Sequence, residues 1–329
     1  MDKKQSYNNI KNCITVELER FEQRFEDVLL TRVPLADSVL HYFLERSGKQ
    51  LRPIITLLTA KMLGEVNDAT INGAAALELL HNATLMHDDV VDQSPTRRGR
   101  DTINRIWDNR VAVLMGDFFL SKCLACSNAT GSLQISVVMA DMVNMLVEGE
   151  LEQISNVRAH LLNEDSYFSV IRGKTASLFA ACMKVGALSV GATEDEKERL
   201  AKIGELMGIV FQIRDDIFDY YPSTQEVGKP TGHDIMEGKI TLPLLYAFQH
   251  APADESARMR QMLEQPQGLT EAQAMQLVDF AKSVGGIEYA QAKMKNLSFE
   301  AKKLLLSFPE NEARNAMVEL IGYFADRNY

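Results

Sequence analysis

Apolar residues recur at the spacing of an α-helix along almost the entire chain of 329 residues. The two-residue alternation of a half-buried strand is not sustained. Proline and glycine punctuate the pattern between many of the periodic segments. Long helices with short links favour one large bundle, so we predict an all-α fold with a single domain over residues 1–329.

Several of the expected helices are longer than the average for soluble proteins. They span residues 5–30, 35–47, 52–64, 68–92, 102–128, 132–156, 164–189, 193–220, 240–249, 255–264, 270–283, 286–306 and 309–326. The longest poorly periodic stretch, residues 221–239, has the size and composition of a functional loop or lid.

The composition excludes several classes of protein. With 46% hydrophobic and 24% charged residues, the chain is expected to be neither disordered nor fibrous. Its net charge of −10 lacks the basic footprint of a nucleic-acid-binding protein. The N-terminus has no apolar signal core, and no run approaches the ~20 apolar residues that span a membrane. We therefore expect a cytoplasmic protein without a transmembrane segment, although transient membrane contact stays open.

The cysteines allow two interpretations. Cys123 and Cys126 form a C-x-x-C pair, which in some proteins is redox-active or binds metal. The pair lies in an apolar helical stretch without a second C-x-x-C or a pair of histidines, and there cysteine behaves as a small hydrophobic residue. The second interpretation is favoured.

Two of the predicted helices end in the same acidic pattern, D-D-x-x-D. The first copy contains Asp88, Asp89 and Asp92, and the second contains Asp215, Asp216 and Asp219. On a helix the first and third aspartates share one face, where like charges repel and the helix C-terminus disfavours anions. The upstream residues match as well, because His81 and Leu85 precede the first copy at the offsets of Gly208 and Gln212 before the second.

Divalent cations offset this repulsion. Oxygen ligands without His or Cys select a hard ion such as magnesium, which binds through one or two carboxylates with water and substrate phosphates. A single copy of the motif is equally well explained as a solvated helix end. Two copies with matching upstream residues favour magnesium ions around a diphosphate.

Basic residues accompany the acidic motifs, as a diphosphate site requires. They are Lys49 and Arg52 at a helix start, Arg97 and Arg98 after the first motif, Arg172 and Lys174 within a helix, and Lys229 and Lys239 after the second motif. Each alone is more often a solvated surface residue, but arginine and lysine beside acidic motifs favour phosphate binding. Gly173 interrupts a predicted helix, which is costly unless it serves packing or function.

These residues stand in the order of the landmarks of the trans-isoprenyl diphosphate synthases, which the chain resembles over nearly its whole length. Further matching landmarks are Gly48–Pro53, Gly116-Asp117, Gly149-Glu150 and Gly173-Lys174-Thr175. The resemblance implies an isoprenoid synthase bundle of long helices around a deep central cavity, normally a homodimer. It implies a prenyltransferase that uses three magnesium ions per active site to join isopentenyl diphosphate to an allylic diphosphate, such as farnesyl or geranylgeranyl diphosphate.

The resemblance also implies roles for individual residues. Magnesium is expected on Asp88, Asp92 and Asp215 directly, and on Asp89, Asp216 and Asp219 through water. The allylic diphosphate is expected on Arg97, Lys174, Lys229 and Lys239, and isopentenyl diphosphate on Lys49, Arg52, His81 and Arg98. Thr175 and Gln212 are expected to stabilise the developing allylic cation, and Lys174 is counted with them as catalytic.

Product length is expected to depend on residues just before the first motif. Short-chain members of the family carry a bulky aromatic residue where this chain has Ala83 or Thr84, so we predict a long all-trans product in the octaprenyl range, for a quinone side chain. Met139 and Met142 are candidates for the channel floor, although methionine at helical spacing is more often core filler. Alternatives are a farnesyl or geranylgeranyl synthase, a terpene cyclase, or a non-catalytic partner subunit. All six aspartates remain, which argues against the last two.

Overall fold

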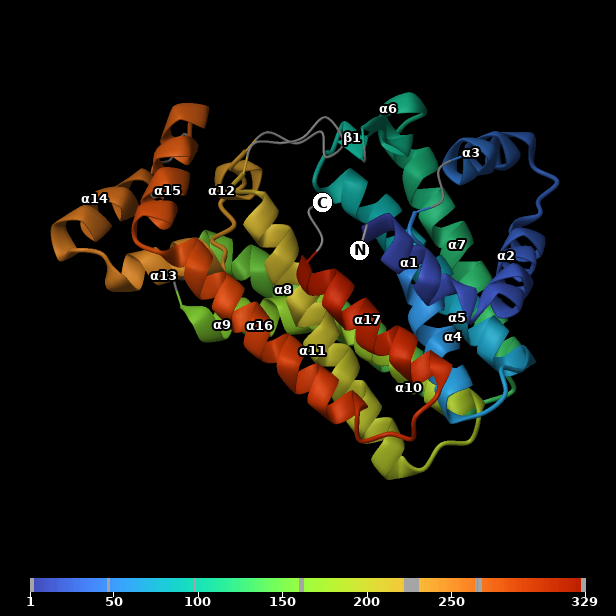
Figure 1. The fold of residues 1–329 in the computed structure, drawn as a ribbon. Helices are drawn as coiled ribbons and strands as arrows, with labels where there is room; N and C mark the ends of the chain where they lie inside the picture. Colours follow the sequence, from blue (N-terminus) through green and yellow to red (C-terminus); the bar gives the residue numbers. More distant parts are fainter. Residues whose placement is uncertain are drawn as a thin grey trace. The chain divides into compact units, whose positions relative to one another are not determined.

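The computed structural model describes residues 3–45, 48–97, 99–159, 163–221, 231–263, 265 and 268–326, with side chains from residue 7 onward. Within these ranges the chain forms α-helices joined by short links and one small antiparallel ribbon (Figure 1). The predicted all-α fold is confirmed.

The elements follow one another in this order. The helices are α1 (Lys3–Asn12), α2 (Thr15–Leu29), α3 (Pro34–Leu44), α4 (Leu51–Leu63), α5 (Asp68–Val91), α6 (Ile103–Ile106), α7 (Asn109–Ala129), α8 (Leu133–Arg158), α9 (Glu164–Ile171), the π-helical turn η1 (Arg172–Ala176), α10 (Ser177–Ser189), α11 (Glu194–Phe218), α12 (His233–Met236), α13 (Leu242–His250), α14 (Ala253–Leu263), α15 (Glu271–Ser283), α16 (Gly286–Leu305) and α17 (Glu312–Asp326). Strands β1 (Thr96–Arg97) and β2 (Arg100–Asp101) pair between α5 and α6.

The chain divides into two compact units, each assembled from segments that are distant in sequence. Unit 1 contains Met1–Asp141, Phe179–Ile203 and Leu305–Leu320, and unit 2 contains Met142–Leu178, Gly204–Leu304 and Ile321–Tyr329. A single domain over the whole chain stays a prediction.

In unit 1 the central helix is α5, which packs against α2, α4 and α7. Its residues between Ile71 and Ala83 are almost all buried, as expected for a helix that is apolar on every side. A capping box starts it: the Asn67 side chain accepts the Thr70 N–H, and the Thr70 hydroxyl accepts the Asn67 N–H. This helix carries the first acidic motif at its end.

Helix α7 meets the length and composition of a membrane span, contrary to the expectation that no segment would do so. Within the described residues it alone does, and 39% of its apolar window is buried. Its packing against α5 explains the buried part of this composition, because a core helix of a folded protein needs the same apolar residues, but other large apolar side chains of α7 are exposed.

In unit 2 glycines allow three helical segments to meet backbone to backbone. A Cβ on Gly173 of η1 would lie 2.7 Å from the Met145 carbonyl oxygen and 3.1 Å from Cα of Gly149, both on α8. A Cβ on Gly208 of α11 would lie 2.5 Å from Cα of Ala176. Packing therefore explains the glycine that interrupts the predicted helix over 164–189, and the π-helical turn falls at the same place.

Three segments differ from the sequence prediction. A turn at Cys13 and Ile14 divides the helix expected over 5–30 into α1 and α2. The helix expected over 102–128 begins again at 109, because Asp108 is extended and its side chain caps the Val111 N–H at 2.8 Å. The stretch over 221–239 contains α12, which starts after a left-handed Gly232.

Candidate active site

The first acidic motif ends α5 in unit 1, and its three aspartates differ in exposure. Asp89 is buried, Asp88 is half-buried and Asp92 is exposed. Arg97 on β1 donates from Nε to Oδ1 of Asp89 at 2.7 Å. Burial raises the pKa of Asp89, and the charge of Arg97 opposes that rise. The middle aspartate therefore pairs with Arg97, while Asp88 and Asp92 share the more open face of the helix.

The basic residues expected around the first motif also belong to unit 1. His81 is half-buried on the stripe that leads to Asp88. At the start of α4, Lys49 is exposed and Arg52 is half-buried. Arg98 lies outside the described residues. Binding of isopentenyl diphosphate by these side chains stays a prediction.

The residues expected to set product length differ in accessibility. Ala83 is fully buried, whereas Thr84 is half-buried and its hydroxyl donates to the His81 carbonyl at 2.8 Å. Met139 and Met142 are buried on α8, the first in unit 1 and the second in unit 2. Thr84 therefore offers the more open position at which to add volume.

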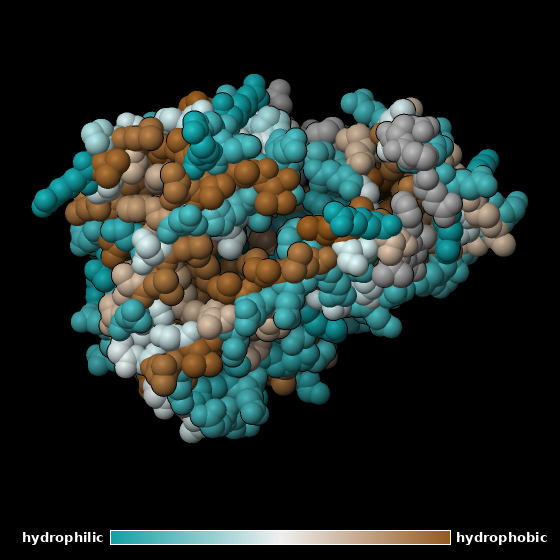
Figure 2. Space-filling model, turned by 180° about the vertical axis from the view of Figure 1, so that it is seen from behind, coloured by the Kyte–Doolittle hydropathy of each residue, from teal (hydrophilic) through white to brown (hydrophobic). Residues whose placement is uncertain are grey.

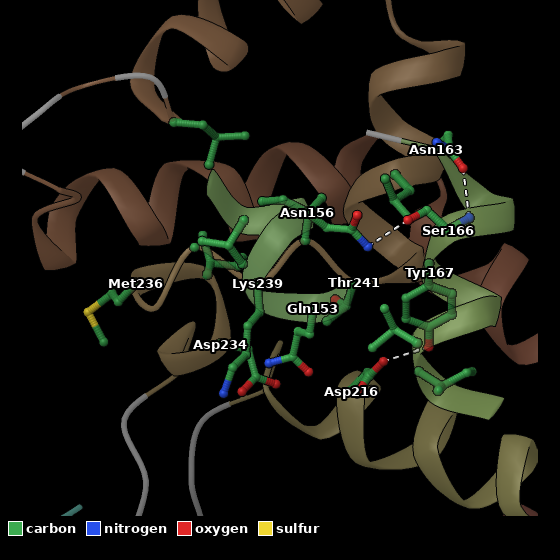
Figure 3. A pocket seen from close by; sticks show the side chains of 18 of the residues that line it. Gln153, Asn156, Asn163, Ser166, Tyr167, Asp216, Asp234, Met236, Lys239 and Thr241 are labelled. Atoms are coloured by element: carbon green, nitrogen blue, oxygen red, sulfur yellow. Dashed lines mark hydrogen bonds between the residues drawn. The ribbon is translucent and has the colours of Figure 1, made fainter. Parts of the chain in front are cut away.

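A cavity of about 240 Å³ lies within unit 2 (Figure 3). Its walls come from α8, α9, η1, α11 and the segment that runs through α12 into α13 and α14. It gathers five of the predicted site residues: Lys174, Thr175, Gln212, Asp216 and Lys239. Lys229 lies outside the described residues.

Four side chains form a hydrogen-bonded network at the wall of this cavity. Tyr167 of α9 donates to Oδ2 of Asp216 at 2.6 Å, as Figure 3 shows. Gln212 donates from Nε2 to Oδ1 of Asp216 at 2.8 Å, and the Thr175 hydroxyl donates to Oε1 of Gln212 at 2.8 Å. Burial raises the pKa of Asp216 to about 8, and the charge of Asp234 adds to the rise. Burial also raises the pKa of Tyr167.

Glutamates hold the two lysines of the cavity in place. Nζ of Lys174 lies 2.5 Å from Oε2 of Glu150 and 3.4 Å from Oε1 of Gln153. Nζ of Lys239 lies 2.7 Å from Oε2 of Glu237. All four charged side chains are only partly exposed. A diphosphate carries more negative charge than one carboxylate, so it can compete for both ammonium groups.

Asp219, the last residue of the second motif, anchors α12. Its Oδ1 accepts the His233 N–H at 2.9 Å, and its Oδ2 accepts the Asp234 N–H at 3.2 Å. The Lys239 N–H in turn donates to the Asp234 carbonyl at 2.8 Å. These bonds hold Asp234 and Lys239, in the last part of the poorly periodic stretch, at the cavity. A water-mediated metal contact from Asp219 stays a prediction, as does direct ligation by Asp215.

The carboxylates of each motif fit a hard divalent cation. Asp88 and Asp92 lie one turn apart on the open face of α5, and Asp215 and Asp219 are both half-buried on the last turns of α11 or just beyond it. Among the described residues no three His, Cys, Asp or Glu side chains converge. Such sparse sets suit magnesium, which takes its other ligands from water and substrate phosphates.

Sequence reasoning missed Tyr167 and Asp234, which both line the cavity. Tyr167 precedes Lys174 by seven residues, a spacing of two helical turns that puts both on one side of a helix. Asp234 lies between the two lysines expected to bind diphosphate, Lys229 and Lys239. An acidic residue between two lysines expected to bind diphosphate was the available signal that Asp234 lies at the site.

Comparison with known proteins identifies the family. A family model described as "Polyprenyl synthetase" matches residues 33–279. The octaprenyl diphosphate synthase of Haemophilus influenzae is 36% identical over 326 residues, which is 98% of each chain.

Solved structures agree. The polyprenyl synthase of Caulobacter crescentus, complexed with calcium and isoprenyl diphosphate, superposes with a TM-score of 0.90 at 31% identity and covers 98% of each chain. A geranylgeranyl pyrophosphate synthase from Bacteroides thetaiotaomicron gives a TM-score of 0.84 at 39% identity, covering 98% of this chain and all of the other. Members of the family use divalent metal ions and isoprenyl diphosphate substrates. The chain therefore belongs to the polyprenyl synthetase family, and it is a trans-prenyltransferase of the polyprenyl diphosphate synthase class.

Proposed function

We propose that this long-chain trans-polyprenyl diphosphate synthase extends an allylic diphosphate with isopentenyl diphosphate to the octaprenyl range, for a quinone side chain. The likeness to the octaprenyl diphosphate synthase over 98% of both chains supports this product class. The observation that carries the activity is the cavity of unit 2, which gathers two lysines, a threonine, a glutamine and an aspartate that the family motif predicts.

The side chains of the cavity suit ionisation of an allylic diphosphate. Lys174 and Lys239 bind the diphosphate in exchange for Glu150 and Glu237. Asp88 and Asp92 of the first motif and Asp215 of the second, with help from the other aspartates, would hold magnesium, which would supply electrostatic neutralisation of the leaving diphosphate. Thr175 presents an oxygen to the carbon that becomes positive. Three magnesium ions per site are part of the proposal.

The product ladder tests the function. The purified protein is incubated with farnesyl diphosphate, labelled isopentenyl diphosphate and magnesium, and the dephosphorylated products are separated by chain length. We expect a ladder that ends near the octaprenyl product. A ladder that stops at geranylgeranyl length would refute the proposed product. A cyclic hydrocarbon would favour a cyclase, and no product without another protein would favour a partner subunit.

Product length is proposed to depend on the partly exposed face of α5 around Thr84, one turn before Asp88. Thr84→Phe adds an aromatic ring at a half-buried position, so it should shorten the product at little cost in stability. Ala83→Phe puts the same ring at a fully buried position, where overpacking costs about 1–3 kcal/mol. Thr84→Val is the matched control, because it keeps the volume, and it should leave the product unchanged. An unaltered ladder from Thr84→Phe would contradict the proposal.

We also propose that two copies of the chain associate. Brown apolar areas gather on the face shown in Figure 2. In unit 1, large apolar side chains are exposed along α7 and the first part of α8, at Val113, Leu114, Leu124, Leu133 and Val137. Light scattering should give twice the chain mass of 36.9 kDa. Leu124→Arg should reduce that mass, whereas Leu30→Arg, at an exposed leucine after α2, should not. A monomer in the unsubstituted protein would refute the dimer.

A further inference from the structure

The network at the cavity of unit 2 has a defined direction. The side-chain NH₂ group of Gln212 donates a hydrogen bond to Asp216, so the side-chain oxygen of Gln212 faces Thr175. A hydroxyl has one proton, and Thr175 donates that proton to Gln212. Two lone pairs of the Thr175 oxygen are therefore left for other contacts, and Thr175 lines the cavity.

This direction is compatible with an ionised Asp216 and with a carboxyl protonated on Oδ2. An ionised carboxylate accepts from both Tyr167 and Gln212. If the carboxyl is protonated on Oδ2, the proton faces Tyr167, which can accept it, and Oδ1 still accepts from Gln212. In both cases Tyr167 and Gln212 each hold one oxygen of the carboxyl in place.

The side chain of Tyr167 is held firmly in place by its surroundings. It is 8% exposed, and its ring meets that of Phe168 edge to face, with centroids 5.3 Å apart. In Figure 3 it reaches from α9 to Asp216 on the neighbouring helix. Without its hydroxyl, Oδ2 of Asp216 would lose this donor and the carboxyl could rotate. A carboxyl held at one oxygen only would fix the Gln212 amide, and through it the Thr175 hydroxyl, less firmly in place.

We propose that Tyr167 is a positioning residue for prenyl transfer: through Asp216 and Gln212 it turns the lone pairs of the Thr175 oxygen toward the carbon that becomes positive. Preorganised dipoles aimed at a developing charge stabilise a transition state. A network held at fewer points would aim the Thr175 oxygen less precisely at that carbon and would stabilise the cation less. The inference rests on the proposed function, because it requires an allylic cation in this cavity.

The first test is Tyr167→Phe, which keeps the ring and removes the hydroxyl. We expect kcat to fall on the order of tenfold, less than the ~10²-fold or greater loss for removing a stabilising group that contacts the reacting centre directly. KM for both substrates should stay within about twofold, since the substrate-binding charges are intact. Tyr289→Phe is the matched control, because Tyr289 also donates to a carboxylate in unit 2, Glu164, but lies outside this network. It should leave kcat unchanged.

A double-mutant cycle separates positioning from a general loss of packing. Thr175→Val removes the hydroxyl that Tyr167 is inferred to orient. If Tyr167 acts through Thr175, Tyr167→Phe should change kcat by less than twofold in the Thr175→Val background. Additive losses, or a change confined to KM, would overturn the inference. If Tyr167→Phe does not fold, Gln212→Leu replaces it in the same cycle, since it breaks the network between Asp216 and Thr175.

The unsubstituted enzyme is assayed alongside the variants, so the two proposals can fail separately. No polyprenyl product from that enzyme would overturn the proposed function and this inference with it. A normal product ladder with an unaffected Tyr167→Phe variant would overturn only the inference.

Discussion

Gly173→Ala should slow catalysis far more than it lowers stability. The added Cβ would lie 2.7 Å from the Met145 carbonyl oxygen, whereas such contacts are normally about 3.3–3.6 Å. The helices must therefore separate locally by about 0.6–0.9 Å, because both partners of the clash are backbone atoms that cannot rotate away. Overpacking of this kind costs about 1–3 kcal/mol of unfolding free energy.

The rate should suffer more because Lys174 and Thr175 directly follow Gly173 on the same π-helical turn. A displacement of about 1 Å in a catalytic group can cost 10²-fold in rate, so kcat should fall between about 10- and 100-fold. The same shift separates Lys174 from Glu150 on α8. Urea unfolding gives the first quantity, and initial rates at saturating substrates give the second.

Gly322→Ala provides the control for the glycine substitution itself. Gly322 is also helical, on α17, but a Cβ there would meet only the flexible end of Lys302, at 3.3 Å from Nζ. Alanine should therefore stabilise the helix by up to about 1 kcal/mol and leave kcat unchanged. If Gly173→Ala also kept its stability and rate, close backbone packing would not explain this glycine.

Two further predictions follow from buried ionisable groups. Burial raises the pKa of Cys123 and Cys182 to about 12, so in the native protein a thiol reagent should modify the half-exposed Cys13 before either of them; peptide mapping that finds Cys123 modified first would contradict this. In the metal-free protein, Asp216 holds its proton up to about pH 8, whereas an unfolded carboxyl loses it near 3.8. Stability from this group is therefore present at low pH and is lost as pH rises through that window. Between pH 5 and 8 in a chelating buffer, the unfolding free energy of the unsubstituted protein should therefore fall relative to that of Asp216→Asn. A difference between the two proteins that stays constant with pH would refute the assigned pKa.

The sequence predicted most helices because local signals mark their ends. Pro34 and Pro243 lie in the first turns of α3 and α13, and side-chain caps begin α5 and α15. It did not predict α12, whose start depends on Asp219, more than a dozen residues earlier in the chain. Nor did it separate α1 from α2, because apolar periodicity continues through Ile10 and Ile14, both fully buried.

The sequence predicted which residues form the candidate site better than it predicted the contacts between them. The motifs identified Lys174, Thr175 and Gln212, but not the contact of Lys174 with Glu150 or the tyrosine that holds Asp216. Such partners lie on other helices, and only the packed fold decides which of many glutamates and tyrosines come within hydrogen-bonding distance. A periodic pattern shows which residues share a face of a helix. It does not show which side chains of other helices pack against that face.

The two acidic motifs show that identical sequence motifs need not have identical roles. In each, the middle aspartate is turned about 100° from the first aspartate and becomes buried. Asp89 then meets a cation, Arg97, whereas Asp216 meets two neutral donors. Burial raises the pKa of both, but the charge of Arg97 opposes the rise for Asp89, whereas the charge of Asp234 adds to it for Asp216. Asp89→Asn should therefore disturb the first motif by removing the negative charge beside Arg97. Asp216→Asn should disturb the second motif by changing the direction of its hydrogen bonds. Equal effects of the two substitutions would count against this distinction.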